Sequence, residues 1–201
     1  MIIHEKDQEL MFLLRGMVQS NKQSKWWIAG GAALNWYQGK PCDSDVDIFF
    51  RTEKGMQRMV DKMNEKSYHI NCFSNGIDPS RYSIYNTAST ENAFTFKIES
   101  SERSWDVQLV KREYFGTAAA VIDNFDITVC QIATDGKDTA VGEYFARDVR
   151  SRRLRFHKIS KGSAKRLVKY WCYGYEPTDA EICAVTNSEG LLWTAGDDEY
   201  A

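Results

Sequence analysis

Residues 26–50 read WWIAGGAALNWYQGKPCDSDVDIFF, and this stretch decides the expected fold. Its apolar start predicts a short strand that ends at Gly30-Gly31 and leads into a helix. The final segment, DVDIFF, predicts a second strand that enters a core from a polar end. Asp45 and Asp47 are two residues apart, so on a strand they point to the same face and can share a divalent cation.

A third acidic residue lies on another predicted strand, SWDVQLV at 104–110. Trp105, Val107 and Leu109 alternate with Asp106, which places the carboxylate on the opposite face from the apolar side chains. A third carboxylate beside the first two permits two Mg²⁺ or Mn²⁺ ions per site, about 3.5–4 Å apart, as in two-metal phosphoryl transfer. The competing interpretation is structural: Asp45 and Asp47 would be turn or capping residues, and Asp106 would be a strand residue that faces solvent.

The glycine pair, Gly30-Gly31, suits the same chemistry. Glycine lets the backbone approach a phosphate closely, and the start of a helix offers free N–H donors. A glycine pair or an acid pair alone is a weak signal. The order strand, glycine pair, helix, acid pair and strand, followed by a lone acid in an apolar strand, is a much stronger one.

The remaining elements predict an α+β fold, with a mixed or antiparallel sheet of about five strands flanked by helices and a small C-terminal helical lobe. A capping box, Thr178-x-x-Glu181, opens the last helix, and Asp135-Gly136 forms a turn. We expect a sheet domain over 1–145 and a helical lobe over 146–201. The predicted helices cover 5–20, 32–37, 52–64, 115–122, 143–153, 163–173 and a segment from 178, and the predicted strands cover 25–29, 45–50, 68–73, 82–85, 94–98 and 104–110.

Composition is that of a globular protein, with 201 residues, 43% hydrophobic and 27% charged. No apolar run reaches the roughly eighteen residues of a membrane span, and the N-terminus lacks the order of a secretory signal. Five scattered cysteines without a CxxC pair argue against a disulfide framework or a cysteine zinc site. We therefore expect a cytoplasmic protein that does not bind membranes, and the oligomeric state is left open.

Charge is unevenly distributed although the net charge is only −2. Residues 147–169 hold ten Lys or Arg against one acid, whereas 176–201 hold seven acids and no Lys or Arg. A dense basic segment is stabilised by an anionic partner such as a triphosphate or a nucleic-acid backbone. Arg152, Arg153 and Lys158 are therefore candidates for contact with RNA. The acidic tail is either solvated or folded over the basic lobe.

The aromatic residues fall into two groups, on the predicted core strands and after the basic helix. Trp26, Trp27 and Trp105 lie on predicted core strands, where packing explains them. The aromatic residues that follow the basic helix either pack in the core or stack on a base or an RNA end; they are Tyr170, Trp171, Tyr173 and Tyr175.

The region from the glycine pair to the acid pair resembles the signature of the DNA polymerase beta-like nucleotidyltransferases. Within that superfamily the sequence is most similar to the bacterial CCA-adding enzyme and poly(A) polymerase family. Residues 125–135 (FDITVCQIATD) resemble the segment that follows the third carboxylate in that family, and residues 163–175 resemble its next basic helix. Phe125 and Cys130 replace an arginine and an asparagine of the family, and its base-reading element EDxxR is missing. A short, phage-type relative is the expected identity.

The resemblance implies a nucleotidyltransferase palm that transfers a nucleoside monophosphate from ATP or another NTP to an acceptor hydroxyl, with release of pyrophosphate. The expected acceptor is an RNA 3′ end of tRNA type. A protein or small-molecule hydroxyl is the alternative within the enzyme class, and a non-catalytic nucleotide or RNA-binding module is the alternative outside it. The resemblance makes Asp45, Asp47 and Asp106 the catalytic metal ligands, and Gly30, Gly31, Ser44, Asp126, Arg166 and Lys169 the nucleotide-binding residues.

Overall fold

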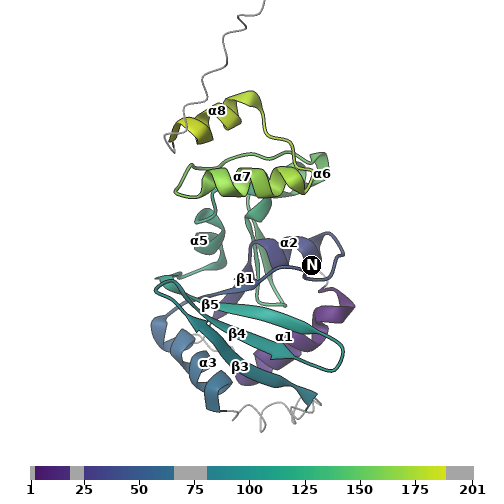
Figure 1. The fold of residues 1–201 in the computed structure, drawn as a ribbon, viewed down its shortest axis with the longest axis vertical. Helices are drawn as coiled ribbons and strands as arrows, with labels where there is room; N and C mark the ends of the chain where they lie inside the picture. The colour runs from purple at the N-terminus through teal and green to yellow at the C-terminus, as the bar shows by residue number, and fades with distance from the viewer. Residues whose placement is uncertain (1–2, 19–24, 66–80, 189–201) are drawn as a thin grey trace, which may run out of the picture.

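The protein is described from a computed structural model, which covers residues 3–18, 25–65 and 81–188. Within these ranges seven strands form one sheet in the order β3-β4-β5-β2-β1-β6-β7, and every neighbouring pair is antiparallel except β2 and β5 (Figure 1). The strands are β1 (Trp26–Ala29), β2 (Val46–Phe50), β3 (Ser83–Ser89), β4 (Ala93–Glu99), β5 (Ser104–Tyr114), β6 (Ile132–Thr134) and β7 (Thr139–Val141).

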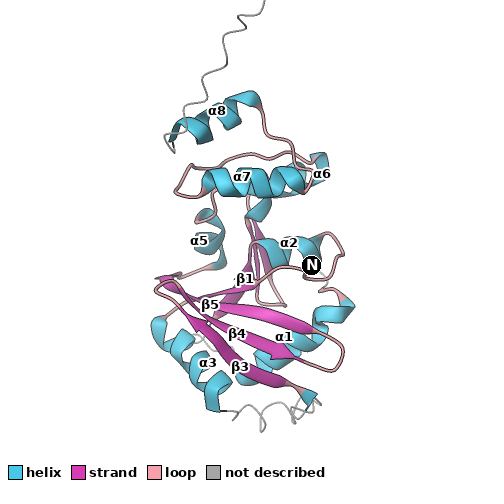
Figure 2. Ribbon diagram, viewed as in Figure 1, coloured by secondary structure: helices cyan, strands magenta, loops and turns pink. Residues whose placement is uncertain are grey.

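Helices cover one face of the sheet and form a separate layer at one end. Figure 2 shows α1 and α3 behind β3, β4 and β5, whereas α6, α7 and α8 are stacked beyond the other end of the sheet. The helices are α1 (Glu5–Met17), α2 (Gly31–Tyr37), α3 (Glu53–Glu65), α5 (Ala118–Asp123), the 3₁₀ turn η2 (Thr128–Cys130), α6 (Phe145–Ser151), α7 (Ser163–Cys172) and α8 (Asp179–Ser188).

The main core lies between the sheet and the helices α1 and α3. Alternate residues of each central strand enter it, because successive side chains of a strand point to opposite faces. On β2 these residues are Val46, Ile48 and Phe50, and on β5 they include Val107 and Leu109. The residues between them therefore lie on the opposite face, and Asp47 is one of these.

The opposite face of the sheet has a smaller core under α5. Trp27, Ala29 and Phe49 pack there against Val121 and Ile122 of that helix. A third core joins α2 and η2 to α6, α7 and α8, so the C-terminal helices are anchored on the segment that follows the glycine pair. The acid pair therefore lies between a packed sheet and a packed helical layer.

Strand β5 contains a register shift. Ile48 of β2 pairs with Leu109, but two residues later Phe50 pairs with Tyr114. Two steps along β2 thus correspond to five along β5, which is the signature of a β-bulge. The bulge carries the end of β5 toward the C-terminal helices.

One buried carboxylate links four segments on the main-core side. Asp7 of α1 is fully buried and accepts hydrogen bonds from the indoles of Trp36 and Trp105, both at 2.8 Å, and from the amide of Cys42 at 2.7 Å. Arg103 completes the set with an ion pair at 3.3 Å. A buried carboxylate with this many donors is fully satisfied and fixes α1 to the sheet.

The α+β fold with flanking helices is confirmed, and most element boundaries agree with the prediction within two or three residues. Two short strands were missed: β6 and β7 lie where the sequence predicts only an apolar stretch and a turn. The predicted strand over 68–73 lies outside the described residues. In the described ranges no helix combines the length and apolar composition needed to cross a membrane. The division at 145/146 stays a prediction.

Candidate active site

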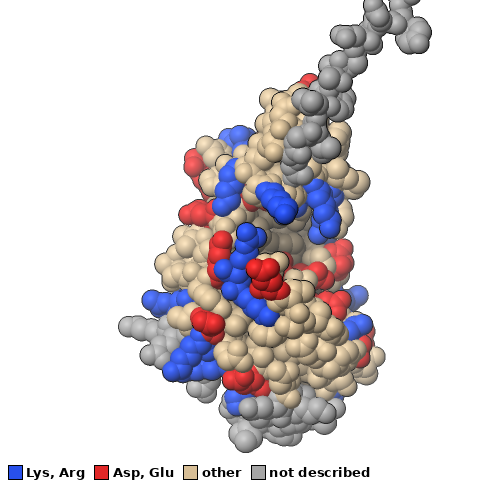
Figure 3. Space-filling model, turned by 60° about the vertical axis from the view of Figure 1, so that its left-hand side comes forward, with Lys and Arg blue, Asp and Glu red and all other residues tan. Residues whose placement is uncertain are grey.

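A cavity of about 490 Å³ lies between the sheet and the C-terminal helices. Figure 3 shows it as a hollow in the surface, with basic side chains along its upper rim and side chains of both signs below. Its walls come from the start of α2, the start of β2, the end of β5, the segment after α5, and α7 with the segment that leads into it.

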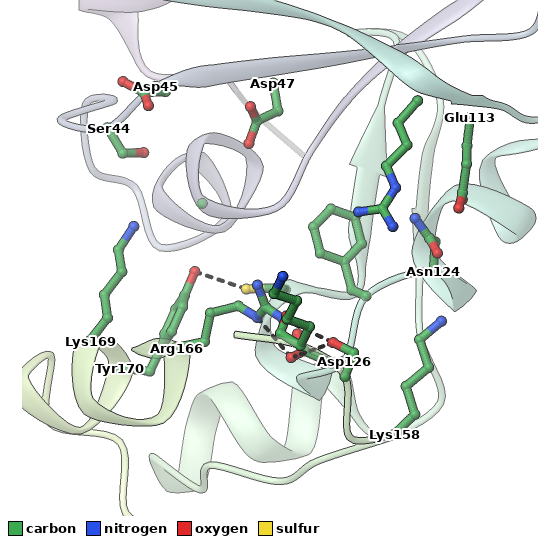
Figure 4. Close-up of a pocket in the computed structure, with 16 residues that line it drawn as sticks. Ser44, Asp45, Asp47, Glu113, Asn124, Asp126, Lys158, Arg166, Lys169 and Tyr170 are labelled. Carbon is green, nitrogen blue, oxygen red and sulfur yellow. Dashed lines mark hydrogen bonds and ion pairs between the residues drawn. The ribbon is translucent and has the colours of Figure 1, made fainter. Parts of the chain in front are cut away.

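The acid pair lies on the sheet wall of this cavity. Asp45 is exposed just before β2, and Asp47 is partly buried on it (Figure 4). Burial, with the neighbouring Asp45 charge as a second cause, raises the pKa of Asp47 to about 7, while Lys169 opposes the shift. Gln108 donates to Asp45 at 2.7 Å. Two carboxylates whose repulsion is only partly compensated form a suitable site for a divalent cation.

Asp106 lies next to this pair and outside the cavity wall. Val46 pairs with Val107, so the residues before them, Asp45 and Asp106, are neighbours on the same face of β2 and β5. Asp106 is exposed on the sheet face opposite the main core, in a part that α5 does not cover. Among the described residues no three His, Cys, Asp or Glu side chains form a group that could hold a metal ion. The structure thus brings two of the predicted carboxylates into the cavity and places the third beside them.

The glycine pair and Ser44 form a tight corner of the cavity. Gly30 has a φ of +73°, and its amide donates to Ile132 at 3.2 Å, so this donor is already used. A Cβ on Gly31 would lie 3.1 Å from the Ser44 hydroxyl. That hydroxyl is buried and has no hydrogen-bond partner in the described part of the chain. A buried donor without a partner next to a cavity favours binding of an oxygen-rich ligand.

Asp126 and Arg166, two predicted nucleotide-binding residues, contact each other on the helical wall. Asp126 is 4% exposed and accepts from Arg166 Nε at 2.7 Å and from the Ser163 hydroxyl at 2.6 Å. Arg166 also donates to the Ser160 hydroxyl at 3.0 Å. The carboxylate therefore holds the start of α7, and the guanidinium is 38% exposed toward the cavity.

Lys169 and Tyr170 complete the helical wall. Lys169 lies close enough to lower the pKa of Asp47 across the cavity. Tyr170 is buried, and its hydroxyl accepts a hydrogen bond from the Cys130 thiol at 2.8 Å. Burial raises the pKa of Cys130 to about 12, so this thiol stays neutral. Cys130 therefore packs beneath the cavity and carries no charge there.

The three predicted RNA-contacting residues have different surroundings. Lys158 lines the cavity and donates to the Asp123 carbonyl at 3.1 Å. Arg152 is exposed at the end of α6, with its guanidinium 5.2 Å from the Tyr175 ring centre. Arg153 forms an ion pair with Glu181 at 3.2 Å. The structure does not gather the three at one place.

Aromatic residues near α7 divide between core and surface. Tyr170 and Tyr175 are buried, in agreement with the packing interpretation. Trp171 and Tyr173 are 50% and 57% exposed, which leaves the stacking interpretation open for these two.

The sequence analysis missed several polar cavity residues: Arg112, Glu113, Asn124, Ser160 and Lys161. The predicted strand ended at Val110, whereas β5 continues to Tyr114. The polar sequence Lys111-Arg112-Glu113 after an apolar strand was the available signal.

Sequence comparison identifies relatives of this chain. The family model for the Gabija anti-defense 2 (Gad2) family matches residues 4–152. The Gabija anti-defense 2 protein of Bacillus phage SPbetaL7 is 26% identical over 155 residues, which cover 76% of this chain and 34% of the relative. The chain thus spans about a third of the length of this curated relative.

Comparison with solved structures identifies the fold. A tRNA-processing enzyme in an apo form superposes with a TM-score of 0.63 at 12% identity, over 95% of this chain and 49% of that chain. The Thermotoga maritima CCA-adding enzyme complexed with tRNA superposes with a TM-score of 0.59 at 13% identity, over 94% of this chain and 44% of that chain. The sheet with its flanking helices is therefore the nucleotidyltransferase fold of the CCA-adding enzymes, and this likeness shows the fold alone.

Proposed function

Because this chain belongs to the Gabija anti-defense 2 family and has the fold of CCA-adding enzymes, we propose that it is a metal-dependent nucleotidyltransferase. It would transfer a nucleoside monophosphate from an NTP to an acceptor hydroxyl and release pyrophosphate. The observation that carries this proposal is the acid pair Asp45 and Asp47, which faces the basic side chains of α7 across one cavity.

The chemistry of the acid pair fits a divalent metal. Asp45 and Asp47 offer hard oxygen ligands on one face, and burial together with the Asp45 charge raises the pKa of Asp47, so a bound cation would favour its charged form. We propose that they bind Mg²⁺ or Mn²⁺, with Asp106 completing a two-ion site. When bound, the ions would polarise the acceptor hydroxyl and neutralise the charge on the leaving pyrophosphate.

The opposite wall and the glycine corner suit the triphosphate. The Ser44 hydroxyl lacks a partner and can donate to a phosphate oxygen, and the space next to Gly31 would be lost if a side chain were present. Lys169 and Arg166 place two cations on the facing helix. We propose these residues, with Gly30 shaping the turn, as the triphosphate site. Asp126 holds Arg166 in place, and we propose that it also positions the ribose.

In the proposed reaction the acceptor oxygen forms a bond to the α-phosphorus, and the bond from that phosphorus to the bridging oxygen of the β-phosphate breaks. The acceptor proton passes to a carboxylate, and Asp106 is the one on the acceptor side. Attack must come from the side opposite the leaving group. With the pyrophosphate near Ser44, the acceptor approaches over the part of that sheet face that α5 does not cover, where Asp106 is exposed.

We propose an RNA 3′ end as the acceptor, in the cytoplasm where NTPs and RNA are present. Support comes from the basic segment that includes Arg152 and Lys158, and from the CCA-adding relative solved with tRNA. Arg153 would have to exchange its Glu181 partner for a phosphate to contribute. A protein or small-molecule hydroxyl would use the same carboxylates, and a binding module would use the cavity without turnover.

The test is incubation with each of the four α-³²P-labelled NTPs, Mg²⁺ or Mn²⁺, and total cellular RNA and protein. Label that moves to RNA with the wild type, and not with an Asp45→Ala/Asp47→Ala variant, supports the proposal. Label on protein supports the alternative acceptor. Stabilisation by NTP without transfer or pyrophosphate release supports the binding module. If the protein shows no stabilisation by NTP and no transfer, the proposal and both alternatives are contradicted.

A further inference from the structure

The cavity has two chemically different ends. Figure 4 shows Ser44, Asp45 and Lys169 at one end and Glu113 and Asn124 at the other. The first end offers a hydroxyl and an ammonium group, which suit phosphate. The acid pair also lies at the first end, where the proposed metal ions would hold the triphosphate. The second end contains Glu113 with the cations Arg112 and Lys158, and lies away from the acid pair. A nucleotide with its triphosphate at the first end would therefore extend its base toward the second.

We propose that the second end is the base-reading site, where Glu113 and Asn124 select a base that carries an exocyclic amino group and Phe125 provides a stacking surface. The inference rests on the proposed function, because it assumes that an NTP occupies the cavity.

An aromatic cluster fixes this end to the catalytic strand. Phe49 of β2 is 5.9 Å from Phe115 and 5.7 Å from Phe125, measured between ring centres, with edge contacts in both cases. Phe115 follows Glu113 by two residues, and Phe125 follows Asn124 directly. Because Phe49 is two residues beyond Asp47 on the same face, the segments that carry the base-reading residues are held at a fixed distance from the acid pair.

The side chains at this end have free hydrogen-bonding capacity. Arg112, Glu113 and Asn124 are exposed and line the cavity, and within the described ranges none of these three side chains forms an internal hydrogen bond or ion pair. Phe125 is partly exposed in the same wall. A set of this kind can bind a ligand without first breaking a protein contact.

The chemistry of Glu113 sets the direction of the selectivity. A carboxylate only accepts hydrogen bonds, so it pairs with the amino groups of adenine, cytosine or guanine. Uracil has no amino group, and its one donor on this edge, N3–H, lies between two carbonyl oxygens that repel a carboxylate. The Asn124 amide both donates and accepts, and Arg112 donates, so these two can read the remaining positions of the base edge. Uridine nucleotides should therefore bind most weakly.

The experiment is equilibrium binding of the four non-hydrolysable α,β-methylene NTP analogues, with Mg²⁺, to the full chain by calorimetry. We expect the tightest analogue to bear an amino group and to bind about tenfold more tightly than the uridine analogue. Glu113→Gln should reduce this ratio to about twofold or less, because a glutamine amide can also donate to uracil. Asn124→Ala should weaken the preferred analogue.

Two controls separate base reading from folding and from triphosphate binding. Glu91→Gln makes the same change at an exposed residue between β3 and β4, and should leave the ratio unchanged. Inorganic tripolyphosphate should bind the wild type and Glu113→Gln equally, and Lys169→Ala more weakly.

The outcomes distinguish this inference from the proposed function. If the wild type binds the four analogues equally, or if discrimination survives both Glu113→Gln and Asn124→Ala, the base-reading site is contradicted while the nucleotidyltransferase proposal stands. If neither the analogues nor tripolyphosphate bind, the proposed function fails and the inference fails with it.

Discussion

Asp7 and Asp47 are carboxylates on opposite sides of the same sheet, and they differ in what surrounds them. Asp7 is fully buried and receives donors from two indoles, one amide and one guanidinium. Asp47 faces another carboxylate, and its pKa is raised. A carboxylate with all its hydrogen-bond partners stabilises the fold. An incompletely compensated carboxylate lowers the stability of the fold, and a bound cation can compensate its charge. The contrast separates a structural acid from one that we propose as a metal ligand.

Replacing the two proposed metal ligands, Asp45 and Asp47, should have the largest effect on activity. An Asp45→Ala/Asp47→Ala variant removes both proposed metal ligands, and we expect nucleotidyl transfer to fall by at least about 10³-fold, the upper range for removing one electrostatic stabiliser. The fold should survive, because the main core does not depend on either side chain. Labelled-NTP transfer and circular dichroism on the same sample test both parts. Retained transfer would contradict the assignment.

Replacing the structural acid, Asp7, should instead lower the stability of the fold. Asp7→Ala leaves two indole donors, an amide and Arg103 without their acceptor, and should lower the free energy of unfolding by about 3–5 kcal/mol. Urea denaturation measures this change. Asp179→Ala, at an exposed residue of α8, should change it by no more than about 0.5 kcal/mol. Similar losses in the two variants would remove the distinction between the acids.

Asp126 sharpens the comparison because it shares features of both acids. It is buried and hydrogen-bonded like Asp7, but its partner Arg166 lines the cavity. Asp126→Asn keeps the shape and removes the charge, so we expect a loss of about 1–3 kcal/mol in unfolding free energy and weaker NTP binding. An NTP affinity equal to the wild type would show that Ser160 and the Lys161 carbonyl are sufficient to hold Arg166.

The titration of Asp47 should have a smaller effect, which is visible in how stability depends on pH. The pKa of Asp47 is 3.8 in its ordinary state and about 7 in the folded chain, so the folded state holds this proton more strongly. Without metal, the resulting stabilisation is complete below pH 3.8 and is lost as the pH rises through about 7. Melting temperatures of the wild type should therefore fall relative to Asp47→Asn across this window. Mg²⁺ should reduce the difference at high pH, and parallel curves would contradict the shift.

The smallest expected effect concerns RNA. Lys158→Ala and Arg152→Ala should each reduce the slope of log affinity against log salt by about 1 if each side chain contacts one phosphate. Lys137→Ala, on the hairpin between β6 and β7, should leave the slope unchanged. Arg153→Ala should instead loosen α8, because Arg153 pairs with Glu181. Equal slopes for all variants would argue for an acceptor other than nucleic acid.

Local patterns explain what could be predicted. The alternation in β2 and β5, and the capping box, depend on residues within a few positions, and Glu181 and Thr178 indeed exchange hydrogen bonds at 2.8 and 3.4 Å. The order of strand, glycine pair and acid pair predicted the fold and the place of Asp45 and Asp47 for the same reason.

Long-range contacts explain what could not be predicted. The indole partners of Asp7 are 29 and 98 residues away, and Arg166 is 40 residues from Asp126. No periodicity marks such pairs, so the sequence analysis did not single out Asp7, and it assigned Asp126 a role only by resemblance. Strands β6 and β7 have only three residues each, too few to show an alternation.

The bulge in β5 decides which way Glu113 points. Leu109 and Tyr114 are an odd number of positions apart, yet both face the α3 side: Leu109 belongs to that core, and the Tyr114 hydroxyl lies 3.9 Å from the Met56 sulfur. In an unbroken strand, Glu113 would share the parity of Leu109 and point into the core. The inserted residues reverse the parity, so Glu113 faces the cavity. A one-residue deletion there would restore the phase and bury a charge, so this irregular stretch should tolerate changes of residue type better than changes of length.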